Sequence, residues 1–159
     1  MNNEIEIILD KTDLHILKLM QENARISNAD LARELGMAPS GVLERVKKLE
    51  QKKVIEQYTT RINPDALQQK MLAFIFTKAK DAPGCNDTAR ALAEIPEVQE
   101  VHHIAGDDCY LVKVRTYDSH SLMNLMRTSF SKIPNLVSTR TTIVLETVKE
   151  QQQLVIPEK

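Results

Sequence analysis

Two short helical segments separated by a tight turn are the feature that most constrains the fold of this chain. Ser27 stands as an N-cap before an apolar helical repeat, and Gly36 follows it where a left-handed residue is favoured. Pro39 then suits the first turn of a further helix, because that position leaves the backbone amide unbonded. A glycine-containing turn between two such helices is typical of a helix-turn-helix unit.

Another helix is expected before this pair, over residues 11 to 22. Asp10 precedes it as an N-cap, and Asp13 lies three residues later, at the spacing of a capping box. The last helix of the three carries one apolar face, formed by Val42, Val46 and Leu49. The sequence therefore predicts a unit of three helices.

The polar positions of the third helix suggest contact with DNA, because the major groove admits an α-helix whose N-terminal side chains reach base edges. Arg45 would donate to guanine, Glu44 would accept from cytosine, and Gly41 would permit close approach. Lysines nearby suit phosphates. The candidate DNA-binding residues are Pro39, Ser40, Gly41, Glu44, Arg45, Lys47, Lys48, Lys52 and Lys53. From these residues alone, an ordinary solvated helix face is the alternative.

The net charge limits how such contact would work. The formal net charge is −1 and the isoelectric point about 6.4, which argues against binding to nucleic acid or membrane by bulk charge. Positive charge is concentrated in residues 40 to 53, where five lysines and arginines stand against two glutamates. Any contact with DNA is therefore expected to be local.

The chain changes character after residue 62. Residues 54 to 62 are rich in β-branched side chains and are expected to form a strand that Asn63 and Pro64 end. Strand and helix patterns then follow in the order βαββαβ, which is typical of a ferredoxin-like domain. The expected strands cover 71–79, 98–104, 110–116 and 136–148, and the expected helices cover 86–93 and 119–132.

The first of these strands is apolar on both faces. Leu72, Phe74 and Phe76 alternate with Met71, Ala73 and Ile75. Helices on one side cover only one face, and a face that met water would carry alternating polar residues. A second subunit is the expected cover for the other face, and the linker strand or the C-terminal tail is the alternative.

The composition suggests a cytoplasmic protein. No apolar run approaches the roughly 20 residues that span a bilayer, and the N-terminus lacks the pattern of a secretory signal. Cys85 and Cys109 form neither a zinc-binding pattern nor a disulfide framework. No membrane contact and no cofactor are expected.

A series of short motifs spans nearly the whole chain. The first half contains Leu9-Asp10-Lys11-Thr12-Asp13, Ala24-Arg25-Ile26-Ser27, Asp30-Leu31-Ala32, Leu35-Gly36-Met37 and Val46-Lys47-Lys48-Leu49-Glu50. The second half contains Pro96-Glu97-Val98, Gly106-Asp107 before Tyr110-Leu111, and residues 139–149. Their order and spacing resemble the leucine-responsive regulator/asparagine regulator (Lrp/AsnC) family of prokaryotic transcription regulators.

The resemblance implies an α+β fold and a function. A winged helix-turn-helix over residues 1–60 would be joined by a linker over 61–70 to a ferredoxin-like βαββαβ domain over 71–159. The implied protein binds double-stranded promoter DNA and forms homodimers through its sheets, with tetramers or octamers of those dimers.

The resemblance also implies a small effector, commonly an amino acid, bound between subunits. The matching residues are Gly106, Asp107, Asp108, Tyr110, Ser138, Thr139 and Thr141. Carboxylates and hydroxyls of this kind suit the ammonium and carboxylate groups of such a ligand. From the residues alone, a capped β-turn beside ordinary strand threonines is the alternative.

The chain departs from the family pattern at three places. Ala38 stands where an N-cap serine is usual, at a cost of roughly 1 kcal/mol to that helix end. Lys53 and Gln57 replace glycines of the wing, so either Lys53 adopts a strained turn or the turn differs. Asp108 and Cys109 replace an aromatic residue and an acid, so the identity of the effector stays open, and a different effector or none is the alternative.

Other functions stay open on the residues alone. His102, His103 and Cys109 include metal-ligand types and would suit a metal-responsive regulator, although adjacent histidines on a strand point to opposite faces. An effector-independent architectural DNA-binding protein is a further alternative. No catalysis is expected, because the chain lacks a glycine-rich phosphate loop and a nucleophile elbow.

Overall fold

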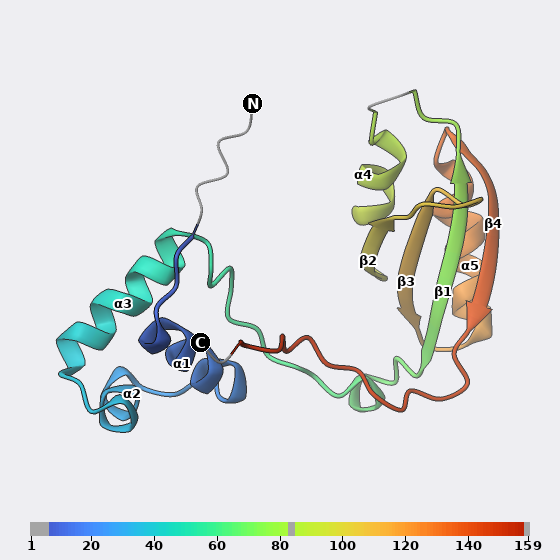
Figure 1. The fold of residues 1–159 in the computed structure, drawn as a ribbon. Coiled ribbons are helices and arrows are strands. Elements are labelled where there is room, and N and C mark those ends of the chain that lie inside the picture. The colour runs from blue at the N-terminus through green and yellow to red at the C-terminus, as the bar shows by residue number, and fades with distance from the viewer. Residues whose placement is uncertain (1–6, 83–84, 158–159) are drawn as a thin grey trace. The chain divides into compact units, whose positions relative to one another are not determined.

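The computed structural model describes residues 7–82 and 85–157 and divides into two compact units (Figure 1). The first unit contains the residues up to 61 together with those from 150 onward, and the second contains residues 62–149. The C-terminal segment therefore groups with the N-terminal unit, whereas the sequence analysis placed it in the second domain. Its sequence, three glutamines followed by Leu154, Val155 and Ile156, does not by itself indicate which unit it joins.

Three helices build the N-terminal unit, and all three were predicted. They are α1 (Lys11–Glu22), α2 (Asn28–Leu35) and α3 (Pro39–Gln51). The capping box of α1 is present, with the Asp13 amide donating to Asp10 Oδ1 at 2.8 Å. Gly36 ends α2 at φ 63°, a left-handed conformation that glycine adopts without strain. These caps fix where each helix begins and ends.

The helices pack around one apolar cluster. It is formed by Ile16, Leu31, Ala32, Val42, Val46 and Leu49. Each fully buried aliphatic side chain of this size stabilises the fold by about 1.5–3 kcal/mol. Because Val42, Val46 and Leu49 anchor one face of α3, the opposite face of that helix is turned outward.

The strand expected over 54–62 is absent. No strand is assigned in the described stretch between α3 and β1, and Val54 and Ile55 instead pack half-buried against the helical cluster. β-branched residues favour strands only when a neighbouring strand pairs with them. Lys53 has φ 57°, so the strained turn considered for it is confirmed. Ala38 makes no side-chain cap bond at the start of α3, also as expected.

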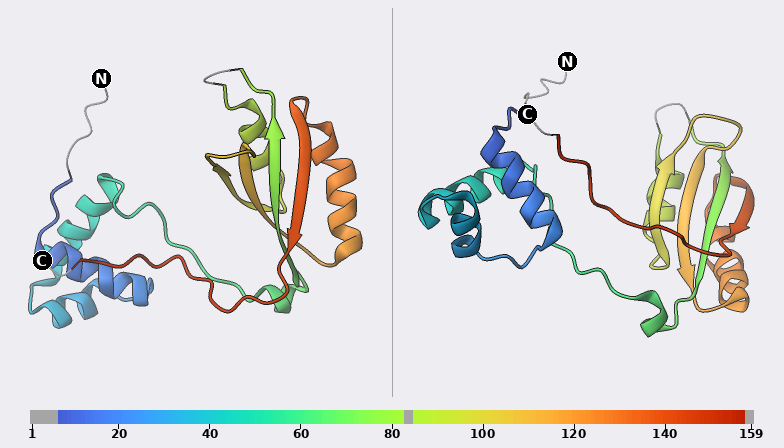
Figure 2. Two further views of the ribbon diagram at one scale, coloured as in Figure 1. Left: turned by 45° about the vertical axis from the view of Figure 1, so that its right-hand side comes forward. Right: turned by 60° about the horizontal axis from the view of Figure 1, so that its bottom comes forward.

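The second unit follows the predicted βαββαβ order. After a short 3-10 turn, η1 (Pro64–Leu67), it contains the following elements in chain order: β1 (Met71–Ala79), α4 (Asp87–Ala93), β2 (Val98–His103), β3 (Tyr110–Thr116), α5 (Ser119–Thr128), a 3-10 turn η2 (Phe130–Lys132), and β4 (Leu136–Ile143). The strands form one antiparallel sheet in the order β2-β3-β1-β4, with β1 and β3 in the centre (Figure 2).

The last strand is shorter than the sequence suggested. It was expected to reach residue 148 but ends at Ile143, which is paired with Ala73 near the start of β1. β4 is an edge strand whose one neighbour is β1. Beyond Ile143 the Val144 amide still donates to the Leu72 carbonyl at 2.9 Å, but no later residue pairs with β1. Propensity along the chain cannot show where this pairing ends.

The two faces of the sheet differ in cover. Ala73 and Ile75 of β1 are fully buried against Leu92 of α4 and Leu122 of α5, so both helices lie on their side of the sheet. Phe74 and Phe76 of the same strand alternate with them and are only partly buried. We call the surface formed by Phe74, Phe76, Leu111, Lys113 and Arg140 the open face.

Candidate functional site

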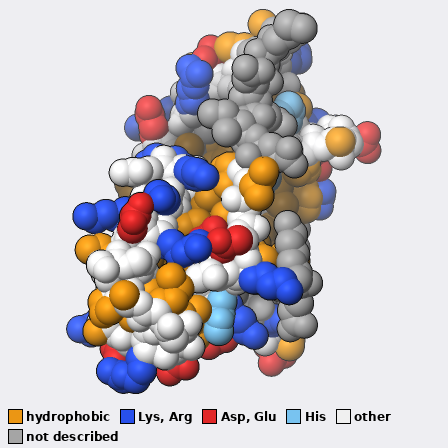
Figure 3. All heavy atoms as spheres, turned by 60° about the vertical axis from the view of Figure 1, so that its left-hand side comes forward, with side chains coloured by type: hydrophobic (Ala, Val, Ile, Leu, Met, Phe, Trp, Pro, Cys, Tyr) orange, Lys and Arg blue, Asp and Glu red, His pale blue; other side chains and the backbone are white. Residues whose placement is uncertain are grey.

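The outward side of α3 carries most of the predicted DNA-binding residues. Pro39, Ser40, Glu44, Lys47 and Lys48 are exposed there, and Lys52 and Lys53 are exposed just beyond its end. Gly41 is half-buried beside Met37, whose side chain would lie 3.6 Å from an added Cβ. On the side of the N-terminal unit shown in Figure 3, basic side chains lie among acidic and apolar ones. That side of the unit is therefore not uniformly positive.

Arg45 does not point away from the protein like its neighbours. Its Nη1 lies 2.7 Å from Asp10 Oδ2 and 2.8 Å from Asp13 Oδ1, and the side chain is 32% exposed. The Asp13 amide and the Arg45 guanidinium hold the pKa of Asp10 below its ordinary value. Arg45 thus connects α3 to the beginning of α1, a contact that the sequence analysis did not foresee.

The other charges of α3 divide into paired and free groups. Lys48 Nζ lies 2.9 Å from Glu44 Oε1, one turn earlier on the same helix. Lys47, Lys52 and Lys53 form no ion pair with any residue that the structure describes. These three ammonium groups are therefore available to an external anion without breaking an internal contact.

The predicted effector residues occupy two faces of the sheet. Asp108 Oδ2 accepts from Arg140 Nη2 at 3.0 Å, and the Arg140 guanidinium lies 4.0 Å from the centre of the Phe76 ring, on the open face. Ser138 lies on the same face, opposite Lys78. Gly106, at φ 146°, and Asp107 are exposed in the loop that leads to this pair. Arg140 was missed because its strand shows no charge pattern.

The remaining effector candidates lie on the helix side of the sheet. Tyr110 and Thr139 both pair with Thr77, and Thr141 pairs with Ile75, so the three share the face that α4 and α5 cover. Thr139 and Thr141 are exposed, but Tyr110 is buried. Within one chain the seven predicted residues therefore do not converge on a single ligand position.

Tyr110 is held by an acid that the sequence analysis overlooked. Its hydroxyl donates to Asp81 Oδ2 at 3.0 Å, while Thr88 Oγ1 and Asn135 Nδ2 donate to Asp81 Oδ1 at 2.7 and 3.0 Å. These donors, Thr88 first, hold the pKa of Asp81 below its ordinary value. The position of Asp81 just after β1 was its one sequence signal.

The histidines considered as metal ligands are separated by the sheet. His102 pairs with Leu111 on the open face and its Nε2 lies 3.1 Å from Glu100 Oε2. His103 lies on the other face, with its ring centre 5.1 Å from that of Tyr110. Within residues 7–82 and 85–157, no three His, Cys, Asp or Glu side chains are placed to hold a metal ion. No helix in the same part of the chain is long and apolar enough to cross a membrane.

A helix-turn-helix with free cations along its third helix, followed by a βαββαβ domain, defines a two-domain DNA-binding regulator. A family model described as winged helix-turn-helix DNA-binding matches residues 9–56, and one described as the Lrp/AsnC ligand binding domain matches residues 70–154. The chain belongs to the Lrp/AsnC family of DNA-binding transcription regulators.

Individual relatives agree over almost the full length. The chain is 36% identical over 150 residues to the leucine-responsive regulatory proteins of Escherichia coli and Salmonella typhimurium, covering 93% of this chain and 92% of each relative. A Neisseria meningitidis transcriptional regulator solved with L-methionine superposes with a TM-score of 0.86 at 27% identity, covering 93% of this chain and 97% of that one. A Mycobacterium tuberculosis feast or famine regulatory protein, also complexed with L-methionine, gives 0.86 at 30% identity, covering 94% and 100%.

Proposed function

We propose that this protein regulates transcription in response to an amino acid or a related small effector bound between two subunits. The observation that carries the proposal is the Asp108–Arg140 pair beside the Gly106 turn. A carboxylate and a guanidinium complement the ammonium and carboxylate groups of a free amino acid. The two relatives solved with L-methionine support a ligand of this class.

Two subunits are part of the proposal because the Asp108–Arg140 pair lies on a face of the sheet that one chain leaves partly uncovered. Phe74, Phe76 and Leu111 of the open face are only partly buried, and an apolar face of this kind is normally covered. A homodimer that joins two open faces would bring each Asp108–Arg140 pair to the subunit boundary. Tetramers or octamers would follow from further contacts between dimers.

The DNA-binding part of the proposal assigns each group on α3 a role. Lys47, Lys52 and Lys53 neutralise phosphates, since they have no carboxylate partner among the described residues. Ser40, at the N-terminal end of α3, faces base edges in the major groove. The protein would act in the cytoplasm, where prokaryotic DNA lies, and the proposal includes no catalytic step.

Effector-independent DNA binding is the second candidate, and one observation favours it. Asp108 and Arg140 already satisfy each other at 3.0 Å, so the pair needs no ligand to be stable. An effector would have to form contacts with Asp108 and Arg140 that are more favourable than the contact between these two residues.

Calorimetric titration of the full chain with each of the common amino acids separates the two candidates. The proposal predicts saturable binding of at least one amino acid, lost in Arg140→Ala. Binding should persist in Arg90→Ala, a control that removes an exposed arginine from α4. Sequence-selective DNA binding without binding of any amino acid would favour the effector-independent regulator.

A further inference from the structure

We propose that Leu43 reads thymine, its side chain contacting the C5-methyl group of a T·A pair in the major groove. This inference rests on the proposed placement of α3 in that groove and adds a specificity-determining residue to it. It concerns a residue that is not among the DNA-binding candidates named from the sequence.

Leu43 is not part of the core of its unit. Its side chain is 39% exposed, whereas Val42, the residue before it, and Val46, three residues after it, are buried. At 100° per residue, Leu43 and Arg45 lie about 200° apart around the helix axis. Arg45 is on the flank that packs against the beginning of α1, so Leu43 is on the opposite flank.

The charged groups of the same half of α3 are already engaged. Arg45 contacts two carboxylates, and Glu44 is paired with Lys48 at 2.9 Å. Recruiting either group to a base would first break an ion pair within the protein. Three exposed side chains at the N-terminal half of α3 have no ion pair among the described residues: Pro39, Ser40 and Leu43.

The chemistry of Leu43 selects its partner on DNA. An isobutyl group forms no hydrogen bond, and the thymine methyl is the apolar group that base edges present in the major groove. Burying one methyl against leucine is expected to change affinity about fourfold. A G·C pair presents no methyl group in the major groove, so Leu43 would gain less from it than from a T·A pair.

Replacing thymine by deoxyuridine tests the contact, because uracil lacks only the C5-methyl. Duplexes selected from a random pool by the full-length wild-type protein would be synthesised with each thymine in turn replaced by deoxyuridine. Wild type should lose about fourfold in affinity at one or two positions of each half-site. Leu43→Ala should bind the thymine duplex more weakly and show no difference between thymine and uracil at those positions.

Leu67→Ala is the matched control, since Leu67 is an exposed leucine of the other unit. It should keep the wild-type ratio of thymine to uracil affinity. Selective binding by wild type with no uracil effect, or an equal uracil effect in wild type and Leu43→Ala, would overturn the role of Leu43. Failure of the wild type to select any sequence would instead overturn the proposed DNA-binding role, and this inference with it.

Discussion

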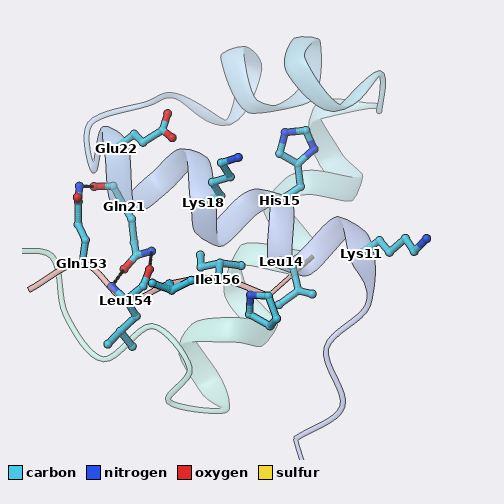
Figure 4. A pocket seen from close by; sticks show the side chains of 11 residues that line it. Lys11, Leu14, His15, Lys18, Gln21, Glu22, Gln153, Leu154 and Ile156 are labelled. Carbon is cyan, nitrogen blue, oxygen red and sulfur yellow. Dashed lines mark hydrogen bonds between the residues drawn. The ribbon is translucent and has the colours of Figure 1, made fainter. Parts of the chain in front are cut away.

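The side-chain carboxamide of Gln21 forms two hydrogen bonds with the backbone of Leu154. Gln21 Nε2 donates to the Leu154 carbonyl at 3.0 Å, and the Leu154 amide donates to Gln21 Oε1 at 2.8 Å (Figure 4). Gln153 Nε2 adds a bond of 2.9 Å to the Gln21 carbonyl. The side chain of Leu154 remains 77% exposed, so this residue is attached to α1 by its backbone hydrogen bonds and not by burial of its side chain.

Gln21→Ala should release this segment, because it removes the donor and the acceptor that the Leu154 backbone uses. Each lost bond is expected to weaken the attachment by about 1 kcal/mol. Amide hydrogen exchange at Leu154 measures the effect, and exchange should become faster by at least tenfold. Gln57→Ala, at an exposed position outside this contact, should leave it unchanged. Equal protection of Leu154 in wild type and Gln21→Ala would contradict the attachment.

Replacing Arg45 by alanine should reduce stability by about 1 kcal/mol, because ion pairs at partly exposed sites contribute modestly. The loss should shrink at 1 M salt, where such pairs are largely screened. Urea unfolding at low and high salt measures both effects. Arg33→Ala is the control, since its pair with Asp30 is more exposed and should contribute less. An equal loss in the two variants, or one independent of salt, would show that Arg45 does not hold α1 and α3 together.

These contacts mark where sequence reasoning succeeded and where it could not. The caps at Asp10, Ser27 and Gly36 were predictable because each depends on residues within one turn of the chain. The strand over 54–62 was predicted wrongly because a strand needs a partner, and its own residues cannot say whether one is present. Arg45 was interpreted from its helix alone, whereas its contacts come from residues more than thirty positions away.

The effector region shows the same limit. Asp108 was identified from its loop, but Arg140 was not, because only the folded sheet brings strand and loop together. Asp81 was overlooked for a similar reason, since its donors Thr88, Tyr110 and Asn135 come from α4, β3 and the turn before β4. Tertiary contacts of this kind leave no periodic trace in the sequence.

Asp81→Ala should destabilise the second unit and weaken its dependence on pH. The substitution leaves the hydroxyls of Thr88 and Tyr110, both buried, without an acceptor, at about 1–3 kcal/mol each. The pKa of Asp81 is lower in the folded chain than its ordinary value of 3.8. Its carboxylate therefore stabilises the fold above that value, and the contribution is lost as pH falls through the lowered pKa. Thermal melts from neutral to acidic pH should show this loss in wild type but not in the variant. If the melting temperatures of the two proteins fell in parallel with pH, the contribution of the Asp81 carboxylate would be contradicted.

Thr77→Val should stabilise the protein. Thr77 is fully buried, and among the described buried side chains its Oγ1 is the one oxygen or nitrogen without a hydrogen-bond partner. Replacing an unsatisfied hydroxyl by a methyl of similar shape should gain about 1 kcal/mol. Thr88→Val removes a hydroxyl that is bonded to Asp81 and should have the opposite sign. A lower melting temperature for Thr77→Val would mean that its hydroxyl has a partner in solution.

The most direct test of the central claim is the salt dependence of DNA binding by the full chain. Mobility shifts on DNA from upstream of its own gene, at several salt concentrations, should show sequence-selective binding that weakens steeply with salt. Lys47→Ala and Lys52→Ala should each reduce the slope of log affinity against log salt by about 0.9, because each removes one phosphate contact. Lys132→Ala, a control in the second unit, should leave the slope unchanged. Two results would contradict the assignment of this surface to DNA. One is the absence of selective binding, and the other is a salt slope that is unchanged in both Lys47→Ala and Lys52→Ala.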